Sequence, residues 1–310
     1  MTVSGPGGPD GPDGADDADD ADGPDGGKAR FDDVYDQPDP RAYFARLAPL
    51  RYEIPHHAQT VFRRTVAEWR TAAPRGGRGA PTVLDVCCSY GVNAALLNHD
   101  LTLAELYEHY TCPRARRLST EELIAWDKEF YAGRRRADAV PVVGLDIAGR
   151  ALRYARAVGL LAAAFTDNLE RGPAGPGLRR AASGVGLLTM TGGGSYVTRR
   201  TFDALLDATR PPVWVSAFVL RTVSYAGIAE ALASRGMRTV ADPARTWPQR
   251  RFTDAREQAY AVEAVRALGA DPEGLESAGR FHTVLYESRP TQQWTSPPTA
   301  PLPTAPPPLR

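Results

Sequence analysis

Apolar positions along this chain change repeatedly between short continuous runs and helical spacing. The short runs predict strands, and the helically spaced residues predict the segments between them. The predicted strands cover residues 82–86, 140–145, 160–165, 185–190, 213–220, 237–240 and 283–286. Strands that alternate with helices favour a parallel sheet covered on both faces. The pattern therefore predicts a doubly wound α/β fold with a mostly parallel, seven-stranded sheet.

Two helical regions stand outside this alternation. Apolar residues at helical spacing precede the first strand, and they predict that residues 29–75 form an N-terminal helical lid. The first two strands are separated by about twice the length that an ordinary strand–helix–strand unit needs. In this excess, Thr102 and Ser119 each begin a capping box, a side-chain arrangement that starts a helix. We therefore predict a helical insertion at residues 101–135.

The place of the insertion in the fold has two interpretations. It leaves the first strand–helix unit on the side where ligands bind in such sheets. We expect it to form a cap whose apolar face, with Trp126 and Phe130, screens the site. The alternative is a stabilising segment that packs on the flank of the sheet.

Composition separates the chain ends from the part that folds. Residues 1–28 carry eight Asp and one Lys among Gly, Pro and Ala, and residues 291–310 are rich in Pro, so both ends are predicted to be disordered tails. Residues 29–290 are predicted to be a single domain, with enough apolar residues in a chain of 43% hydrophobic content to bury a core.

Charge and cysteine content exclude several classes of function. The net charge is zero and the Arg residues are scattered, so we expect no nucleic-acid partner. No apolar run is long enough for a membrane span, and no signal pattern begins the chain, which favours a cytoplasmic location. Cys87, Cys88 and Cys112 lack the spacing of zinc ligands, so we expect no metal site.

Residues 83–91 have the features of a ligand-binding turn. An apolar strand runs into small residues and then into a helix whose N-terminus can receive a ligand. The segment resembles the first motif of the class I S-adenosylmethionine (SAM)-dependent methyltransferases, an acidic residue followed by a glycine-rich turn. Asp85 matches the acidic residue and Gly91 the third glycine, whereas Cys87 and Ser89 stand where the first two glycines usually lie. The resemblance implies that the cofactor is bound by Asp85, Cys87, Cys88, Ser89, Tyr90 and Gly91.

Two later segments extend the resemblance. Asp146 ends an apolar strand shortly before a helix, where an acidic side chain can accept both hydroxyls of a ribose. The resemblance implies that Ile147 packs on the adenine and that Asp167, with Asn168 beside it, holds the adenine amino group. The competing interpretation is that the acidic residues are only strand-end caps. In outline the resemblance covers residues 82–286 and implies a Rossmann-like fold.

Three residues are candidates for a catalytic role. Tyr196 follows the fourth predicted strand in a glycine-rich turn and can place its ring or hydroxyl near a sulfonium. Tyr35 and His56 precede the first strand, in the predicted lid, where His56 is a candidate general base. Each also has a structural interpretation, as an aromatic residue that fills a helix–sheet joint or as a histidine held in the core.

The leading interpretation is a SAM-dependent methyltransferase that acts on a small molecule, with a role in specialised metabolism. A sulfonium is already a strong leaving group, so the protein need only align the acceptor and exclude water. The small-residue turn, the insertion and the turn at Tyr196 are also similar to azetidine-2-carboxylate synthases, which cyclise SAM and release methylthioadenosine. A third hypothesis is a non-enzymatic scaffold with the SAM-binding fold, whose tails recruit partners.

Overall fold

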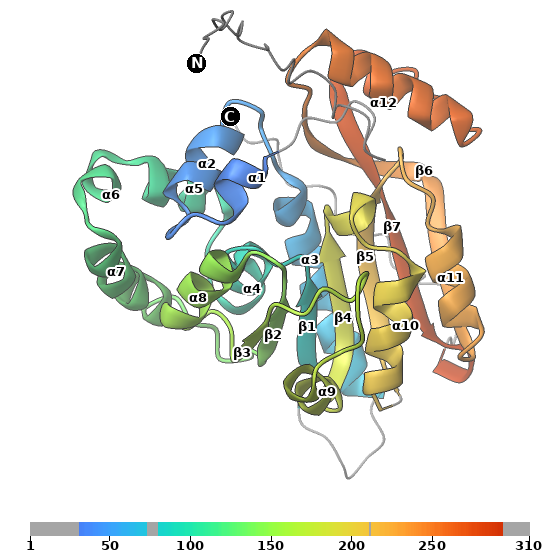
Figure 1. Cartoon of the computed structure of the whole chain (residues 1–310), viewed down its shortest axis with the longest axis horizontal. Coiled ribbons are helices and arrows are strands. Elements are labelled where there is room, and N and C mark those ends of the chain that lie inside the picture. The colour runs from blue at the N-terminus through green and yellow to red at the C-terminus, as the bar shows by residue number, and fades with distance from the viewer. Residues whose placement is uncertain (1–30, 73–79, 211, 294–310) are drawn as a thin grey trace, which may run out of the picture.

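The computed structural model describes residues 31–72, 80–210 and 212–293, and its centre is a single sheet (Figure 1). The strand order is β3-β2-β1-β4-β5-β7-β6. The strands are β1 (Thr82–Val86), β2 (Val142–Leu145), β3 (Ala163–Phe165), β4 (Val185–Thr191), β5 (Trp214–Leu220), β6 (Met237–Arg251) and β7 (Arg280–Pro290). β1 to β5 pair in parallel, and β7 is antiparallel to both of its neighbours. The predicted Rossmann-like α/β fold with a mostly parallel, seven-stranded sheet is confirmed.

The central strands agree with the prediction more closely than the last two. β1 has the predicted bounds, and every residue of β4 and β5 is buried, as expected for strands covered on both faces. β6 and β7 extend well beyond residues 237–240 and 283–286. Their extra residues are mostly polar, and the β6–β7 register shifts twice, so no regular alternation reveals them.

Helices cover both faces of the sheet and enclose two large hydrophobic cores, and the described residues form a smaller third cluster around Phe281. The helices are α1 (Asp32–Tyr35), α2 (Arg41–Leu47), α3 (Ile54–Ala72), α4 (Val92–Asn98), α5 (Leu103–Thr111), α6 (Pro113–Arg117), α7 (Thr120–Ala132), α8 (Gly149–Ala157), α9 (Pro176–Ala182), α10 (Arg199–Ala208), α11 (Ala226–Ala233) and α12 (Ala255–Ala267), with short 3-10 helices η1 (Gly193–Ser195), η2 (Glu276–Ala278) and η3 (Thr291–Gln293). Successive strand residues face opposite sides, so Val83 joins the core under α3, α4 and α8, and Leu84 joins the core under α9, α10 and α11. No helix in the described ranges is long and apolar enough to cross a membrane.

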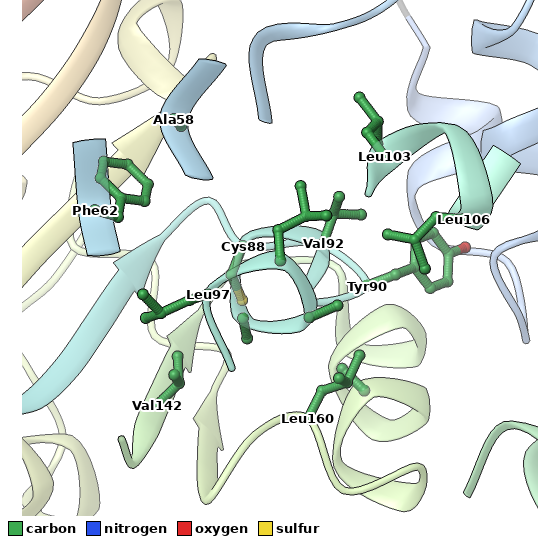
Figure 2. Packing of buried hydrophobic residues seen from close by; sticks show 14 of the residues in the cluster. Ala58, Phe62, Cys88, Tyr90, Val92, Leu97, Leu103, Leu106, Val142 and Leu160 are labelled. Atoms are coloured by element: carbon green, nitrogen blue, oxygen red, sulfur yellow. The ribbon is translucent and has the colours of Figure 1, made fainter. Parts of the chain in front are cut away.

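The first turn of the fold is held from several directions. All seven residues of α4 are buried. Around it lie Ala58 and Phe62 of α3, Leu103 and Leu106 of α5, and Val142 of β2 (Figure 2). This packing supports the backbone that joins β1 to α4, which is the segment that carries the first sequence motif.

The two predicted capping boxes are present in the insertion. The side chain of Thr102 accepts a hydrogen bond from the Glu105 N–H and that of Ser119 from the Glu122 N–H, and both glutamates bond back. α5 packs against α2, away from the centre of the sheet (Figure 1). Of the predicted tails, residues 1–28 and 294–310 lie outside the described residues.

Candidate functional site

A cavity of about 460 Å³ lies at the carboxyl edge of the parallel strands. Its size is within the range of ~300–1,000 Å³ that is typical of small-molecule sites. The turns after β1, β2, β3 and β4 form one wall, and the N-terminal segment with the end of β6 forms the other. Ligands of doubly wound sheets bind at this edge.

The turn after β1 has the backbone conformation of a glycine-rich turn without the first two glycines. Cys87 and Ser89 have φ angles of 56° and 47°, and in the described residues Arg51 alone shares a positive φ among residues other than glycine. Such angles are costly for residues with a Cβ and persist where the surroundings enforce them. The side chain of Cys87 also fills space, because a Cβ on Gly193 would lie 2.7 Å from its Sγ.

Asp146 lines the cavity immediately after β2. Its Oδ2 accepts a hydrogen bond of 2.8 Å from the Ser89 N–H, and its Oδ1 accepts one of 2.9 Å from the Ala148 N–H. Burial raises the pKa of Asp146, and the backbone hydrogen bonds from Ala148 and Ser89 oppose that rise. A carboxylate oxygen accepts more than one hydrogen bond, so both oxygens remain able to bind a ligand hydroxyl.

Large apolar side chains are exposed at the same cavity. The large hydrophobic side chains exposed in the described residues are Ile147, Tyr196 and Leu268, at 71%, 46% and 48% exposure, and the first two line the cavity. Asp167 and Asn168 line it after β3, where the Gly175 N–H donates to Asp167 Oδ1 at 2.5 Å. The edge from β2 to β3 thus combines an exposed apolar surface with acidic and amide side chains.

Three residues of the first motif lie behind the cavity wall instead of in it. Among the described residues, Asp85, Tyr90 and Gly91 are not part of the lining. Tyr90 bonds through its hydroxyl to the Gln37 N–H at 2.9 Å and to the Gln37 carbonyl at 3.0 Å, which ties the turn to the N-terminal segment. Gly91 has a φ of 76° and packs where a Cβ would lie 3.3 Å from the Ala155 Cβ. The predicted direct contact of these residues with a ligand is therefore not supported by their positions.

Asp85 acts on the cavity through its neighbours. It accepts hydrogen bonds from Thr189 Oγ1 at 2.7 Å and from Asn93 Nδ2 at 3.2 Å. Asn93 also donates to Thr191 Oγ1 at 2.9 Å, and both Asn93 and Thr191 line the cavity. Burial raises the pKa of Asp85 to about 7, although the hydrogen bonds from Thr189 and Asn93 lower it.

Two of the three predicted catalytic residues reach the cavity. Tyr35 and Tyr196 line it, but among its described lining residues His56 is absent. The reason is helical geometry: Pro55 on α3 lines the cavity, and the next residue is turned by about 100° around the helix axis. His56 lies instead beside His57, with ring centroids 5.4 Å apart, and burial lowers its pKa. His56 is therefore not among the described lining residues, and its role as general base stays a prediction.

The insertion lies outside the described lining of the cavity. No described lining residue belongs to residues 101–135. The insertion packs behind the N-terminal segment, where Arg41 donates to the carbonyls of Ala115 and Leu118 at 2.9 and 2.7 Å. Phe44 of α2 stacks on Tyr110 of α5 with ring centroids 4.7 Å apart. The positions of these helices do not support the expected cap, which stays a prediction; their apolar faces pack against the N-terminal segment.

Several lining residues carry no signal in the sequence. Tyr43 and Tyr52 line the inner end of the cavity and are buried, and burial raises the pKa of each. Gln249 and Arg250 arrive there from β6. Thr191 differs from these residues, because it ends an apolar strand and is followed directly by three glycines. That pattern is visible in the sequence.

No protein-family model and no curated protein matches this chain. Similar solved structures are distant. A functionally unknown protein from Deinococcus radiodurans R1 is 14% identical and has a TM-score of 0.39, with 74% of this chain and 99% of that chain covered. The plantazolicin methyltransferase BpumL in complex with S-adenosylhomocysteine (SAH) is 9% identical and has a TM-score of 0.37, with 76% and 85% covered. The magnesium protoporphyrin IX methyltransferase of Synechocystis PCC 6803 with bound SAM is 13% identical and has a TM-score of 0.33, with 74% and 79% covered. These similarities are too distant to assign an activity or a ligand to this chain.

Proposed function

We propose that this chain binds SAM and transfers its methyl group to a small molecule. The observation that carries the proposal is the pair of neighbouring residues after β2: a carboxylate held by two backbone N–H groups at Asp146, and a large apolar side chain left exposed at Ile147. A ribose with two hydroxyls and a flat purine match these two surfaces. An exposed apolar side chain in a concave site is typical of a ligand contact.

The other lining residues fit the remaining parts of SAM. Asp167 and Asn168 offer acceptors beyond the adenine position, at the β3 side. On the other side, the turn 87–89 and the turn 191–193 border the space that extends away from the ribose. Bound SAM would supply an activated methyl group on its sulfonium sulfur. After transfer of the methyl group to the acceptor, this sulfur would be the neutral thioether of SAH.

The chain's own residues would then orient the acceptor and exclude water. Tyr35, Tyr43 and Tyr52 surround the inner end of the cavity, and burial raises the pKa of each, so they stay neutral at physiological pH. Neutral tyrosines offer a hydroxyl for hydrogen bonding and a ring face that attracts a cation by about 0.5–2 kcal/mol. Tyr196 adds a partly exposed ring at the mouth.

A second candidate is cyclisation of SAM to azetidine-2-carboxylate and methylthioadenosine. Cys87 and Ser89 favour it, because they keep a glycine-like backbone but bring side chains into the turn that would border the methionine part of SAM. Those side chains leave less room for the usual path of that part, which supports an altered conformation with the amine nearer the γ-carbon. Attack by the amine requires its neutral form, which an apolar enclosure favours.

The product formed from SAM tests these candidates. The purified protein is incubated with SAM alone and with a broad panel of small acceptors, and the nucleoside products are identified by mass spectrometry. Methyl transfer predicts SAH that forms only when an acceptor is present. Methylthioadenosine formed together with azetidine-2-carboxylate from SAM alone would establish the cyclase instead. If SAM binds in calorimetry but neither nucleoside forms across the panel, the proposed reaction is wrong and the scaffold hypothesis gains.

A further inference from the structure

Gln249 is a buried polar residue that the proposed function does not yet use. It lines the cavity from the end of β6 and is only 4% exposed. In the part of the chain that the structure describes, its side-chain Oε1 has no hydrogen-bond partner. A buried polar atom without a partner lowers the stability of the fold. Such a group is expected where a ligand supplies the partner.

Asn93 has the same property in the same cavity. Its Nδ2 is used by Asp85 and Thr191, whereas its Oδ1 has no partner among the described residues. Asn93 is 8% exposed and lines the cavity. These two unpartnered atoms are amide oxygens, which accept hydrogen bonds and do not donate them. The third unpartnered side-chain atom of the described lining is the Ser89 hydroxyl, which can do either.

The two amides belong to one end of the cavity. Gln249 Nε2 lies 3.2 Å, and Tyr52 Oη 3.4 Å, from the point where a side chain at Gly192 would begin. Gly192 follows Thr191, whose Oγ1 accepts the hydrogen bond from Asn93. This end lies on the β4 side of the first turn, whereas Asp146 follows β2, on its other side.

The charged side chains around the cavity favour one sign of charge on a bound ligand. Four acidic side chains line it: Asp36, Asp146, Asp167 and Glu170. Arg250 is the basic residue among the described lining residues, and its guanidinium is bound by both carboxylate oxygens of Glu257, at 2.8 and 2.5 Å. The unused acceptors favour a group that donates hydrogen bonds. The four acidic side chains lie on other parts of the lining, and they give the cavity as a whole a field that favours positive charge.

We propose that Gln249 and Asn93 form a subsite for an amino group, in which Gln249 Oε1 accepts a hydrogen bond from the nitrogen. The proposal rests on the proposed function and adds the chemistry of the group at the inner end. The amino group has two possible sources with the same chemistry: the α-amine of SAM itself, or the amine of an acceptor. Gln249 is then a specificity-determining residue.

The first test measures binding and stability with Gln249→Leu, a variant of similar volume without an acceptor. Its melting temperature should equal or exceed that of the wild type, because an unpaired buried atom is removed. The matched control is Asn98→Leu, since the Asn98 carboxamide both donates to and accepts from the Val140 backbone at 2.8 and 2.9 Å. That variant should have a lower melting temperature.

Calorimetry with SAH and methylthioadenosine distinguishes the source, because methylthioadenosine lacks the amino-acid part. If the nitrogen belongs to SAM, Gln249→Leu should weaken SAH binding by roughly 10- to 100-fold and leave methylthioadenosine unchanged. If it belongs to the acceptor, SAH binding should be unchanged, and kcat/KM should fall by a similar factor for phenethylamine but not for 2-phenylethanol. Gln249→Glu keeps an acceptor and should retain the amine preference.

Two outcomes overturn the proposal while the proposed function stands. In the first, the wild type binds SAH, but Gln249→Leu has unchanged affinities for SAH and methylthioadenosine and unchanged kcat/KM for both acceptors. The other is an equal loss in Gln249→Leu and Gln249→Glu, which would show that the acceptor atom is irrelevant. Absence of SAH binding to the wild type would instead refute the proposed function.

Discussion

Replacing Asp146 tests the nucleoside site most directly. Asp146→Ala removes the carboxylate proposed to bind the ribose and leaves the Ser89 and Ala148 N–H groups without their 2.8 and 2.9 Å partners. A hydrogen bond to a charged group contributes about 1.5–3 kcal/mol. Loss of two such bonds to neighbouring hydroxyls, partly replaced by water, should lower SAH affinity by about 3 kcal/mol. We therefore expect a dissociation constant raised by roughly 100-fold.

A ligand control separates the ribose contact from damage to the turn. Isothermal titration calorimetry should be run with SAH and with its 2′,3′-dideoxy analogue, on the wild type and on Asp146→Ala. Because the analogue lacks both hydroxyls, the substitution should change its affinity far less than that of SAH, and the difference is the coupling between carboxylate and ribose. Equal losses for the two ligands would show that the variant acts through the turn, and unchanged SAH affinity would refute the site.

The pH dependence of binding gives the same residue a second test. Burial raises the pKa of Asp146, and only the ionised carboxylate accepts charge-assisted hydrogen bonds. SAH affinity of the wild type should therefore decrease as pH is lowered toward that raised pKa, and this decrease should be absent in Asp146→Ala. An identical pH profile in both proteins would contradict the assignment.

Two further predictions concern stability. The pKa of Asp85 is about 7 in the fold against an ordinary value of 3.8, so ionisation of Asp85 lowers the free energy of unfolding progressively as pH rises from about 4 to 7. Asp85→Asn should flatten that part of the profile in urea unfolding between pH 5 and pH 8, and an unaltered slope would contradict it. Trp126 and Phe130 pack on the His109 ring with centroids 3.9 Å away, so each Ala variant should lose up to about 3 kcal/mol of stability and keep SAH affinity. Weaker SAH binding in a variant that remains fully folded would instead support the interpretation of the insertion as a cap over the cavity.

The residues proposed to bind the nucleoside could be singled out from the sequence because they are adjacent in it. Asp146 and Ile147 follow directly from a strand, and parallel strands bring their carboxyl ends to one edge. The same logic located the turn at Cys87 and Ser89. It could not distinguish residues that line the cavity from those that stand behind it, because consecutive residues of a turn face different directions. Asp85 is the example, buried under Asn93 instead of beside a ligand.

The residues at the other end of the cavity, where Gln249 lies, are brought there only by the tertiary structure. Gln249 lies in a polar stretch of β6 that bulges twice and has no alternating pattern, and only the β6–β7 pairing brings it to the cavity. His56 is absent from the described lining because one step along α3 turns it away from the space that Pro55 lines. The insertion packs its apolar faces against α2 of the N-terminal segment and contributes no described residue to the cavity lining. Sequence alone determined the strand–turn–helix order and the sheet edge that carries Asp146 and Ile147, since these depend on local periodicity. Which residues line the inner end of the cavity depends on contacts between segments that are distant in sequence, and local periodicity does not encode such contacts.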